Sequence, residues 1–315
     1  MHIALQIFLL VGGLSVALVA SDRAVAYTRA LAKTLGAPAF IVGVVLVSIG
    51  TDLPEIANSI AAHVQGKGDV NVGDSVGSAL TQYTFVLGLF PLIVAMIAID
   101  RRQVGLVTIA TMAGLGLTAW FVSDGWLGRA EGAVLIGGWG LATVLLVRLL
   151  PGSSHVADIP PPVRLQGIPA QAAATLVALV FVGFGATVAV RALVRLAETV
   201  GVPEFLLAFF GASMGTSAPE IAVDVTALLR GAPAIALGDA LGSSFVDSTL
   251  SIGAGPLVVP AEVTPRLAVV GSLYSLVAVA AVGLLLGARR RHDRLSAAAL
   301  LALYALAYLV VVRAS

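Results

Sequence analysis

The chain contains the same pair of short motifs twice, and the two copies are separated by 165 residues. The first motif is Gly-Thr-x-x-Pro-Glu, at residues 50–55 and 215–220, and the second is Gly-Asp-x-x-Gly-Ser, at residues 73–78 and 238–243. A gapless alignment around these motifs gives 19 identities in 56 positions. A match of this length at one fixed offset indicates an internal duplication, so each half of the chain should fold as a copy of one unit.

The composition places both copies in a membrane. Hydrophobic residues make up 59% of the chain, charged residues make up 11%, and the mean hydropathy is +1.03. These values lie far outside those of soluble proteins. Apolar runs bounded by charges, glycines or prolines predict ten transmembrane helices, at roughly 3–31, 38–64, 70–98, 104–122, 130–149, 169–198, 203–229, 233–259, 266–288 and 295–313.

The number of spans in each copy predicts the architecture. Five is an odd number, so the second copy must enter the membrane from the side opposite to the first. We therefore predict an all-α membrane protein of ten transmembrane helices, arranged as two inverted-topology five-helix repeats with broken helices at an ion site. Residues 1–149 form the first repeat, residues 150–168 a polar linker that contains prolines, and residues 169–315 the second repeat. Secondary transporters with such repeats bind their substrate at the repeat interface, near the middle of the membrane.

The charged and chelating residues predict an orientation and exclude several functions. With the N-terminus outside, most lysines and arginines fall in cytoplasmic loops, so a multi-pass cell-membrane protein with both termini extracytoplasmic is predicted. The net charge of +1, without a long basic block, argues against nucleic acid as a partner. The chain has no cysteine, which excludes disulfides and thiolate metal sites. Its four histidines are scattered in predicted loops or termini, so a histidine metal site is not expected.

The second and third predicted helices of each repeat carry polar side chains in otherwise apolar segments. Four pairs of these side chains are separated by four residues: Thr51 and Glu55, Ser78 and Gln82, Thr216 and Glu220, and Ser243 and Asp247. A spacing of four places both members of a pair on one face of a helix. The inverted symmetry should then bring the four polar faces together at one centre.

Two prolines add free backbone oxygens to this predicted centre. Pro54 and Pro219 have no N–H to donate to the carbonyls of Gly50 and Gly215. Within a membrane such unsatisfied carbonyls are tolerated only where they line a cavity or meet a ligand. Carboxylates, hydroxyls, an amide and free carbonyls together form the ligand set of a hard cation, and Ca²⁺ takes about 6–8 oxygens.

Several of these residues also have a purely structural interpretation. Asp52 and Ser217 each precede a glutamate by three residues, so either could be the N-cap of a capping box rather than a ligand. Capping alone does not explain a carboxylate inside a membrane span, which by default has a functional role. We therefore interpret Glu55 and Glu220 as functional and leave both interpretations open for Asp52 and Ser217.

The second motif leaves a similar choice. Ser78 and Ser243 follow glycines and could simply be small residues that allow close helix packing. Their position four residues before Gln82 and Asp247 favours a role as ligands. Asp74 and Asp239 could cap the next helical segment or bind a cation.

At these motifs the chain resembles the cation/calcium antiporter superfamily, and most closely its sodium/calcium exchanger branch. The resemblance covers essentially all ten predicted spans. It implies a secondary active antiporter, not an enzyme, that exchanges Ca²⁺ for Na⁺ across the lipid bilayer by alternating access, with the first and sixth helices sliding past the core. No cofactor is implied. By position, the resemblance assigns Ca²⁺ to Glu55 and Glu220 with the carbonyls of Thr51 and Thr216, and Na⁺ to Ser78, Ser217, Ser243 and Asp247.

The chain departs from the family pattern at four positions. Asp52 stands where the family commonly has serine, Ala79 and Ser244 stand where it commonly has asparagine, and Gln82 replaces a further asparagine. With Asp52 the predicted centre holds four carboxylates, which one Ca²⁺ cannot neutralise, so a proton or further cations should bind as well.

These departures keep other functions open. Exchange of H⁺, in place of Na⁺, for Ca²⁺ or another divalent cation is the alternative on the same scaffold. A cation channel is the alternative from another class, since broken helices and a polar pore suit one. An intramembrane aspartyl protease would also use paired carboxylates, but the twin prolines and the many oxygen ligands argue against it.

Overall fold

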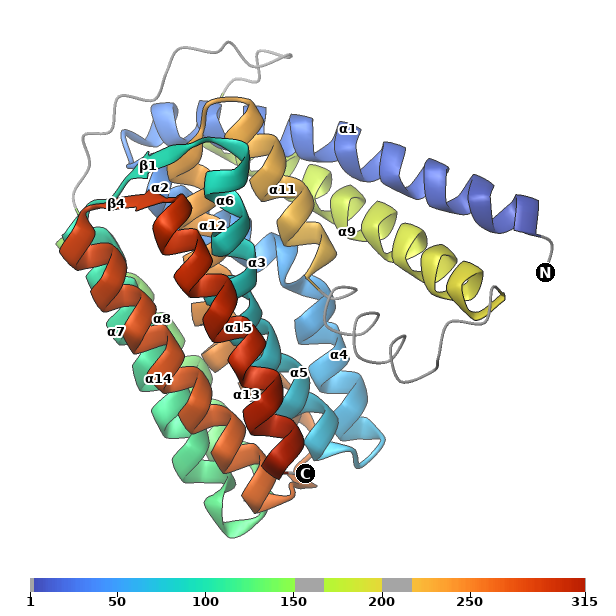
Figure 1. Ribbon diagram of the computed structural model, residues 1–315, viewed down its shortest axis with the longest axis vertical. Coiled ribbons are helices and arrows are strands. Elements are labelled where there is room, and N and C mark those ends of the chain that lie inside the picture. Colours follow the sequence, from blue (N-terminus) through green and yellow to red (C-terminus); the bar gives the residue numbers. More distant parts are fainter. Residues whose placement is uncertain (1–2, 151–166, 200–216, 315) are drawn as a thin grey trace. The chain divides into compact units, whose positions relative to one another are not determined.

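The computed structural model describes residues 3–150, 167–199 and 217–314. Most of these residues lie in helices, and two short antiparallel ribbons account for the strands (Figure 1). The prediction of an all-α membrane protein is therefore confirmed.

The chain divides into two compact units. Unit 1 comprises residues 1–53 and 152–239, and unit 2 comprises residues 54–151 and 240–315. Each unit therefore takes one segment from the first half of the sequence and one from the second. The two repeats predicted from the sequence are not the two packing units.

Unit 1 is built around two long helices that run side by side (Figure 1). Its described elements are α1 (Ile3–Leu35), α2 (Ala39–Val42), the π-helical η1 (Gly43–Val47), α3 (Ser48–Thr51), α9 (Ile168–Thr199), α11 (Ala218–Leu229) and the first half of α12 (Pro233–Val246). Small residues explain why α1 and α9 pack closely. Gly13, Ala17, Ala20 and Ala24 form a buried stripe along α1, at the helical spacing of three and four residues.

Unit 2 holds the remaining helices and both ribbons. Its elements are α4 (Leu53–Val64), α5 (Gly68–Thr81), the π-helical η2 (Gln82–Val86), α6 (Leu87–Ile93), β1 (Met96–Ala98), α7 (Arg101–Phe121), the 3-10 helix η3 (Val122–Asp124), β2 (Trp126–Leu127), α8 (Arg129–Leu149), the second half of α12, the π-helical η4 (Asp247–Ser251), α13 (Ile252–Val258), β3 (Ala261–Glu262), α14 (Pro265–Arg289), β4 (Arg291–Asp293) and α15 (Arg294–Ala314). β1 pairs with β4 and β2 pairs with β3, so each ribbon joins a strand from one half of the sequence to a strand from the other.

The element bounds repeat at the same offset as the sequence. Adding 165 to the bounds of α4, α5, η2, α6 and α8 gives those of α11, α12, η4, α13 and α15. The duplication is thus visible in local structure, including a π-helical turn of five residues at the same place in each copy. The agreement extends beyond the aligned motifs, because α8 and α15 lie outside the region of 56 aligned positions.

The described residues account for most of the predicted spans. Six helical stretches are long and apolar enough to cross a membrane, and α2–α3 together with α4 makes a seventh if this broken pair counts as one span. The predicted span 203–229 begins in residues 200–216, outside the described part of the chain. The total of ten spans and the division into residues 1–149, 150–168 and 169–315 stay predictions.

The closest approach of α1 to α9 generates a testable prediction. A Cβ added at Gly13 would lie 2.7 Å from the backbone of Gly185 and Ala189, whereas one added at Gly12 would meet nothing within 4 Å among the described residues. Gly13→Ala should therefore lower the stability of the protein by about 1–3 kcal/mol, because the helix backbones must separate. Thermal unfolding in detergent checks this. Gly12→Ala is the matched control, and an equal loss in both variants would contradict the packing argument.

Candidate metal centre

A helix break in each copy sets the positions of the candidate ligands. α3 ends at Thr51, Asp52 leaves helical geometry with φ −80° and ψ 4°, and α4 begins at Leu53. Ser217 has nearly the same conformation, with φ −83° and ψ 7°, directly before α11. Pro54 and Pro219 follow each break by two residues. The breaks that we predicted from the prolines are thus present, at equivalent residues.

Two carboxylates face each other within unit 1. One oxygen of Asp52 and one of Glu220 lie within 4.8 Å of each other, and both side chains are almost fully buried, at 1% and 0% exposure. At this distance two unit charges repel by about 3 kcal/mol for an effective dielectric constant near 20. A cation between them removes this repulsion, so the pair has the chemistry of a hard-cation site.

The residues beside this pair were also predicted as ligands. The hydroxyl of Ser217 is buried and makes no hydrogen bond to a described residue, and it does not cap α11 although Ser217 occupies the N-cap position. The capping interpretation is therefore wrong for the Ser217 side chain. Thr51 is buried, and its hydroxyl lies 3.1 Å from the carbonyl oxygen of Val47 and 3.3 Å from Oδ1 of Asp239. Thr216 and the carbonyl of Gly215 lie outside the described residues.

Glu55 follows Asp52 by three residues and lies in the first turn of α4 in unit 2, where it is 2% exposed. Hydrogen bonds farther along α4 hold this helix in place. Ser59 accepts a bond of 3.0 Å from the backbone N–H of Gly255, and His63 lies buried at the end of the helix. The position of Glu55 therefore depends on contacts of α4 with α13.

His63 has no free ring nitrogen, although we expected it in a loop. Its Nδ1 donates to the carbonyl of Val259 at 2.7 Å, and its Nε2 accepts from the Asn71 amide at 2.9 Å. The same amide nitrogen donates to the carbonyl of Ile252 at 3.0 Å. A carbonyl can only accept, so these partners require the neutral ring with the proton on Nδ1. His63 thus ties α4, α5 and α13 together and is not available to a metal.

The predicted ligands of the third helix in each repeat gather in unit 2. The hydroxyl of Ser244 donates to the carbonyl of Ala79 at 3.0 Å. Ala79 and Ser244 are two of the three positions at which the chain departs from the asparagines common in the family, and their small side chains let α5 and α12 touch. Ser78 and Ser243, their neighbours, are buried at the same crossing. Their burial agrees with close packing of the helices, and their role as ligands stays a prediction.

Gln82 and Asp247 each start a π-helical segment, η2 and η4. Both side chains are buried, and Oε1 of Gln82 accepts no hydrogen bond from a described residue. A π-helical turn widens the helix and leaves backbone groups without their usual partners, and such turns are frequent at functional sites. The sequence motifs located these two residues but contained no signal for the π-helical turns.

The second motif does not cap helices. Asp74 lies within α5 and Asp239 lies within α12, several residues after each helix begins. The capping interpretation of both aspartates is therefore wrong. Asp74 accepts a hydrogen bond of 2.6 Å from Nδ2 of Asn58.

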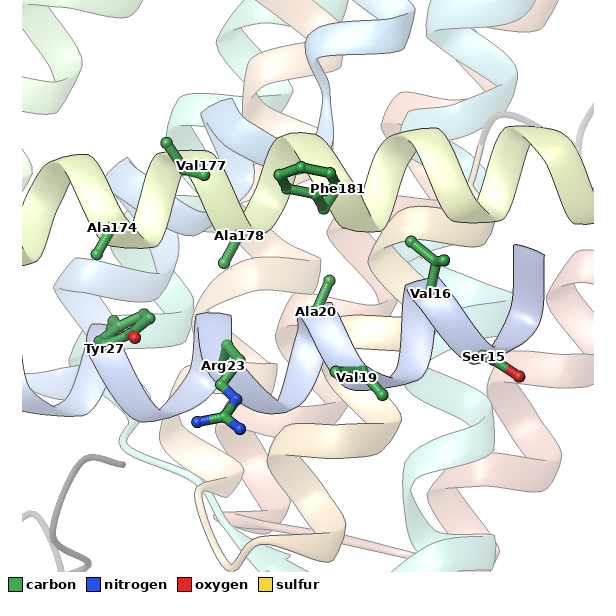
Figure 2. Close-up of a pocket in the computed structure, with 10 residues that line it drawn as sticks. All are labelled: Ser15, Val16, Val19, Ala20, Arg23, Tyr27, Ala174, Val177, Ala178 and Phe181. Atoms are coloured by element: carbon green, nitrogen blue, oxygen red, sulfur yellow. The ribbon is translucent and has the colours of Figure 1, made fainter. Parts of the chain in front are cut away.

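A cavity between α1 and α9 is not part of this centre. It has a volume of about 590 Å³, and Figure 2 shows Ala20, Ala174 and Ala178 facing between the two helices. The guanidinium of Arg23 points away from α9 in the same view. Most of the lining is apolar, and its polar members are Ser15, Arg23 and Tyr27 without any carboxylate, so the cavity does not have the oxygen set of a hard-cation site.

A comparison with known protein families identifies the family of the chain. A family model described as sodium/calcium exchanger protein matches residues 5–148 and 171–313, which is most of the chain. The chain belongs to the sodium/calcium exchanger family. The resemblance noted at the motifs is therefore confirmed, as is the prediction of an ion transporter rather than an enzyme.

Relatives of this exchanger-family chain include proteins from bacteria and an archaeon. A protein of Alkalimonas amylolytica named "Putative antiporter CaxA" is 31% identical over 311 residues, covering 94% of each chain. The inner membrane protein YrbG of Escherichia coli K12 is 27% identical, covering 82% of this chain and 81% of its own. The sodium/calcium exchanger MaX1 of Methanosarcina acetivorans is 24% identical, covering 83% and 85%.

The fold has a counterpart among solved structures. The sodium–calcium exchanger NCX_Mj, soaked with 10 mM Na⁺ and zero Ca²⁺, aligns with a TM-score of 0.81 over 98% of this chain and 99% of its own, at 21% identity. At this identity the likeness shows the fold. The chain is thus a multi-pass membrane protein with the fold of that exchanger.

The facing carboxylates of this exchanger-family chain predict an effect of Ca²⁺ on stability. Ca²⁺ should raise the thermal midpoint of the wild-type protein over its value in chelator, since a bound ion stabilises the folded state. Glu220→Gln should lose most of this rise, because it removes one of the two facing charges. Thermal unfolding in detergent, with Ca²⁺ or with chelator, measures both. The exposed Glu262, on β3, supplies the control Glu262→Gln, and a full Ca²⁺ response in Glu220→Gln would rule out the site.

Proposed function

We propose that the chain is a secondary active antiporter that exchanges Ca²⁺ for Na⁺ by alternating access. The observation that carries this proposal is the pair of buried carboxylates, Asp52 and Glu220, at a helix break in unit 1. Glu55 follows Asp52 by three residues at the start of α4. Membership of the sodium/calcium exchanger family supports the same conclusion, as does the name of the relative MaX1.

The proposed ligands divide by ion. Glu55 and Glu220 bridge Ca²⁺, with help from the backbone carbonyls of Thr51 and Thr216. The flanking Na⁺ ions are bound by Ser78, Ser217, Ser243 and Asp247, and Gln82 and Asp52 adjust these sites. The burial of every described member of this set supports the assignment, because polar and ionisable side chains inside a membrane protein are costly and mark ion pathways.

The proposed architecture is that of two inverted five-helix repeats with ten spans in all. The agreement of element bounds at an offset of 165 residues supports the repeats, and the odd number of spans per repeat requires their inversion. The positive-inside rule places both termini outside the cytoplasm. In this architecture α1 and α9 are the first and sixth spans, and the small side chains between them suit two helices that move as one body.

Competition for the same carboxylates couples the two ions. The Na⁺ ions in the flanking sites compete with Ca²⁺ for the negative charge of the same carboxylates, so each ion empties the other's site, and only the loaded carrier changes its orientation. If three Na⁺ exchange for one Ca²⁺, one net charge crosses in each cycle. The membrane potential then contributes about 2.3 kcal/mol per 100 mV.

The alternative counter-ion is the proton, and Asp52 is the observation that favours it. A carboxylate replaces the serine that is common in the family, and it faces Glu220 within a buried site. A proton on either side chain removes the repulsion as well as a cation does. A cation channel is the alternative from another class, and single-channel recording tests it, because a channel shows unitary conductance and neither carrier does.

Transport in proteoliposomes tests the proposal. An outward Na⁺ gradient should drive ⁴⁵Ca²⁺ into vesicles that contain the wild-type protein. Glu55→Gln should abolish the uptake, since it removes a charge that balances Ca²⁺, and Glu262→Gln should leave it unchanged. Absence of Ca²⁺ uptake under both Na⁺ and H⁺ gradients would exclude the calcium assignment.

The role of Asp52 is tested in the same vesicles. Asp52→Ser, which restores the residue common in the family, should keep uptake driven by Na⁺ and abolish any uptake driven by an H⁺ gradient alone. This result follows from the loss of the additional titratable carboxylate. Uptake on an H⁺ gradient that survives Asp52→Ser would assign proton coupling to another residue.

A further inference from the structure

A second carboxylate lies on α11 one turn after Glu220. Asp224 is fully buried, and neither of its oxygens accepts a hydrogen bond from a donor among the described residues. The equivalent residue in the first repeat is Ser59, whose hydroxyl accepts the N–H of Gly255. The second repeat thus carries a buried carboxyl group where the first carries a satisfied hydroxyl.

The group that faces Asp224 is another carboxylate, that of Asp239 on α12. The two side chains lie within hydrogen-bonding reach of each other, and Asp239 is also fully buried. Oδ1 of Asp239 is 3.3 Å from the hydroxyl of Thr51, and Oδ2 has no donor among the described residues. Two ionised carboxylates cannot hydrogen-bond to each other, so either the pair shares a proton or a metal cation lies between the two side chains.

Close backbone contacts within unit 1 hold this pair together. A Cβ on Gly43 would lie 2.7 Å from the carbonyl oxygen of Ile235 and 3.0 Å from the backbone nitrogen of Asp239, and a Cβ on Gly238 would collide with the carbonyl oxygen of Phe40. The two glycines let α12 pack directly on α2 and η1. These contacts fix the position of the α12 backbone from which the Asp239 side chain extends.

The corresponding position in the first repeat shows what a satisfied carboxylate looks like. Asp74, the equivalent of Asp239, accepts a hydrogen bond from the Asn58 amide and is partly exposed. It needs no cation, because the Asn58 amide donates to it. The aspartate itself is the same in both repeats. The repeats differ at Asp224, which is Ser59 in the first repeat, and at Val223, which is the donor Asn58 in the first repeat.

We propose that Asp224 and Asp239 hold one Na⁺ between their carboxylates, with the hydroxyl oxygen of Thr51 as a further ligand. Carboxylate and hydroxyl oxygens suit hard cations. The few oxygens of this pair favour a monovalent ion, since Ca²⁺ takes about 6–8. The choice of Na⁺ over a proton rests on the proposed function, but the need for positive charge between the two carboxylates does not.

This site also explains how Na⁺ could influence a divalent ion without displacing it directly. Both aspartates interact electrostatically with Glu220. A Na⁺ one helical turn away therefore lowers the affinity of Glu220 for Ca²⁺, and by linkage Ca²⁺ lowers the affinity of the pair for Na⁺ by the same factor.

Thermal unfolding of the purified full chain tests the site without transport. NaCl is varied against choline chloride at constant ionic strength and without divalent ions. The number of Na⁺ ions linked to unfolding, taken from the dependence of stability on Na⁺ concentration, should fall by about one in Asp224→Asn. Asp224→Ser, which introduces the residue of the first repeat, should behave in the same way, and Asp239→Asn replaces either variant that fails to fold.

Asp74→Asn is the matched control and should keep the wild-type response to Na⁺. An unchanged Na⁺ response in Asp224→Asn would overturn the proposal and leave a proton as the occupant of the pair. An equal loss in Asp74→Asn would overturn it as well, since the effect would then not depend on this site. A protein that fails to transport Ca²⁺ yet loses one linked Na⁺ in Asp224→Asn would refute the proposed function and retain this site.

Discussion

Carboxylates that are removed from water inside a membrane protein need positive charge, and this requirement governs the core of the molecule. An isolated buried carboxylate costs far more than the few kcal/mol by which a protein is stable. Asp52, Glu220, Asp224 and Asp239 all lie buried in unit 1, and Glu55 and Asp247 lie buried in unit 2. The helix breaks and the close glycine contacts bring these side chains into place. The stability of the folded state should therefore depend on the cations or protons that neutralise these carboxylates.

The two copies of the duplicated unit share their backbone but differ in charge. Asp52 and Ser217 have almost the same backbone angles, and one is an acid while the other is a hydroxyl. Ser59 and Asp224 show the reverse assignment. A duplication that began with equal halves has thus placed its carboxylates unequally. Such inequality lets ions of different charge bind at different positions in a pseudo-symmetric protein.

Part of this site could be predicted from the sequence, and the reason lies in the kind of signal involved. Pro54 marks a helix break because its ring removes a donor, which is a local property of one residue. The spacing of four residues placed Ser243 and Asp247 on one face, which follows from the helix period alone. The family itself could be predicted because paired motifs at a fixed offset rarely arise by chance.

Other features depend on contacts that no local pattern contains. The π-helical segments η2 and η4 begin at the predicted ligands Gln82 and Asp247. The spacing of apolar residues along such a short segment does not distinguish a π-helical turn from an α-helical one. His63 ties its helix to the end of α13 only because Val259, which is distant in sequence, supplies a carbonyl. Asp224 lies outside the duplicated motifs and was missed. A charged residue inside a predicted span was the available signal.

The exchange of segments between the two packing units bears on how such a chain could have arisen. Unit 1 needs residues from both halves, and each ribbon of unit 2 pairs a strand of one half with a strand of the other. A single copy of the duplicated unit would therefore contain no complete unit and no complete ribbon. A product of the gene before its duplication would therefore have needed a second copy of itself to form either unit or either ribbon. Fusion then removed the need for the two copies to find each other.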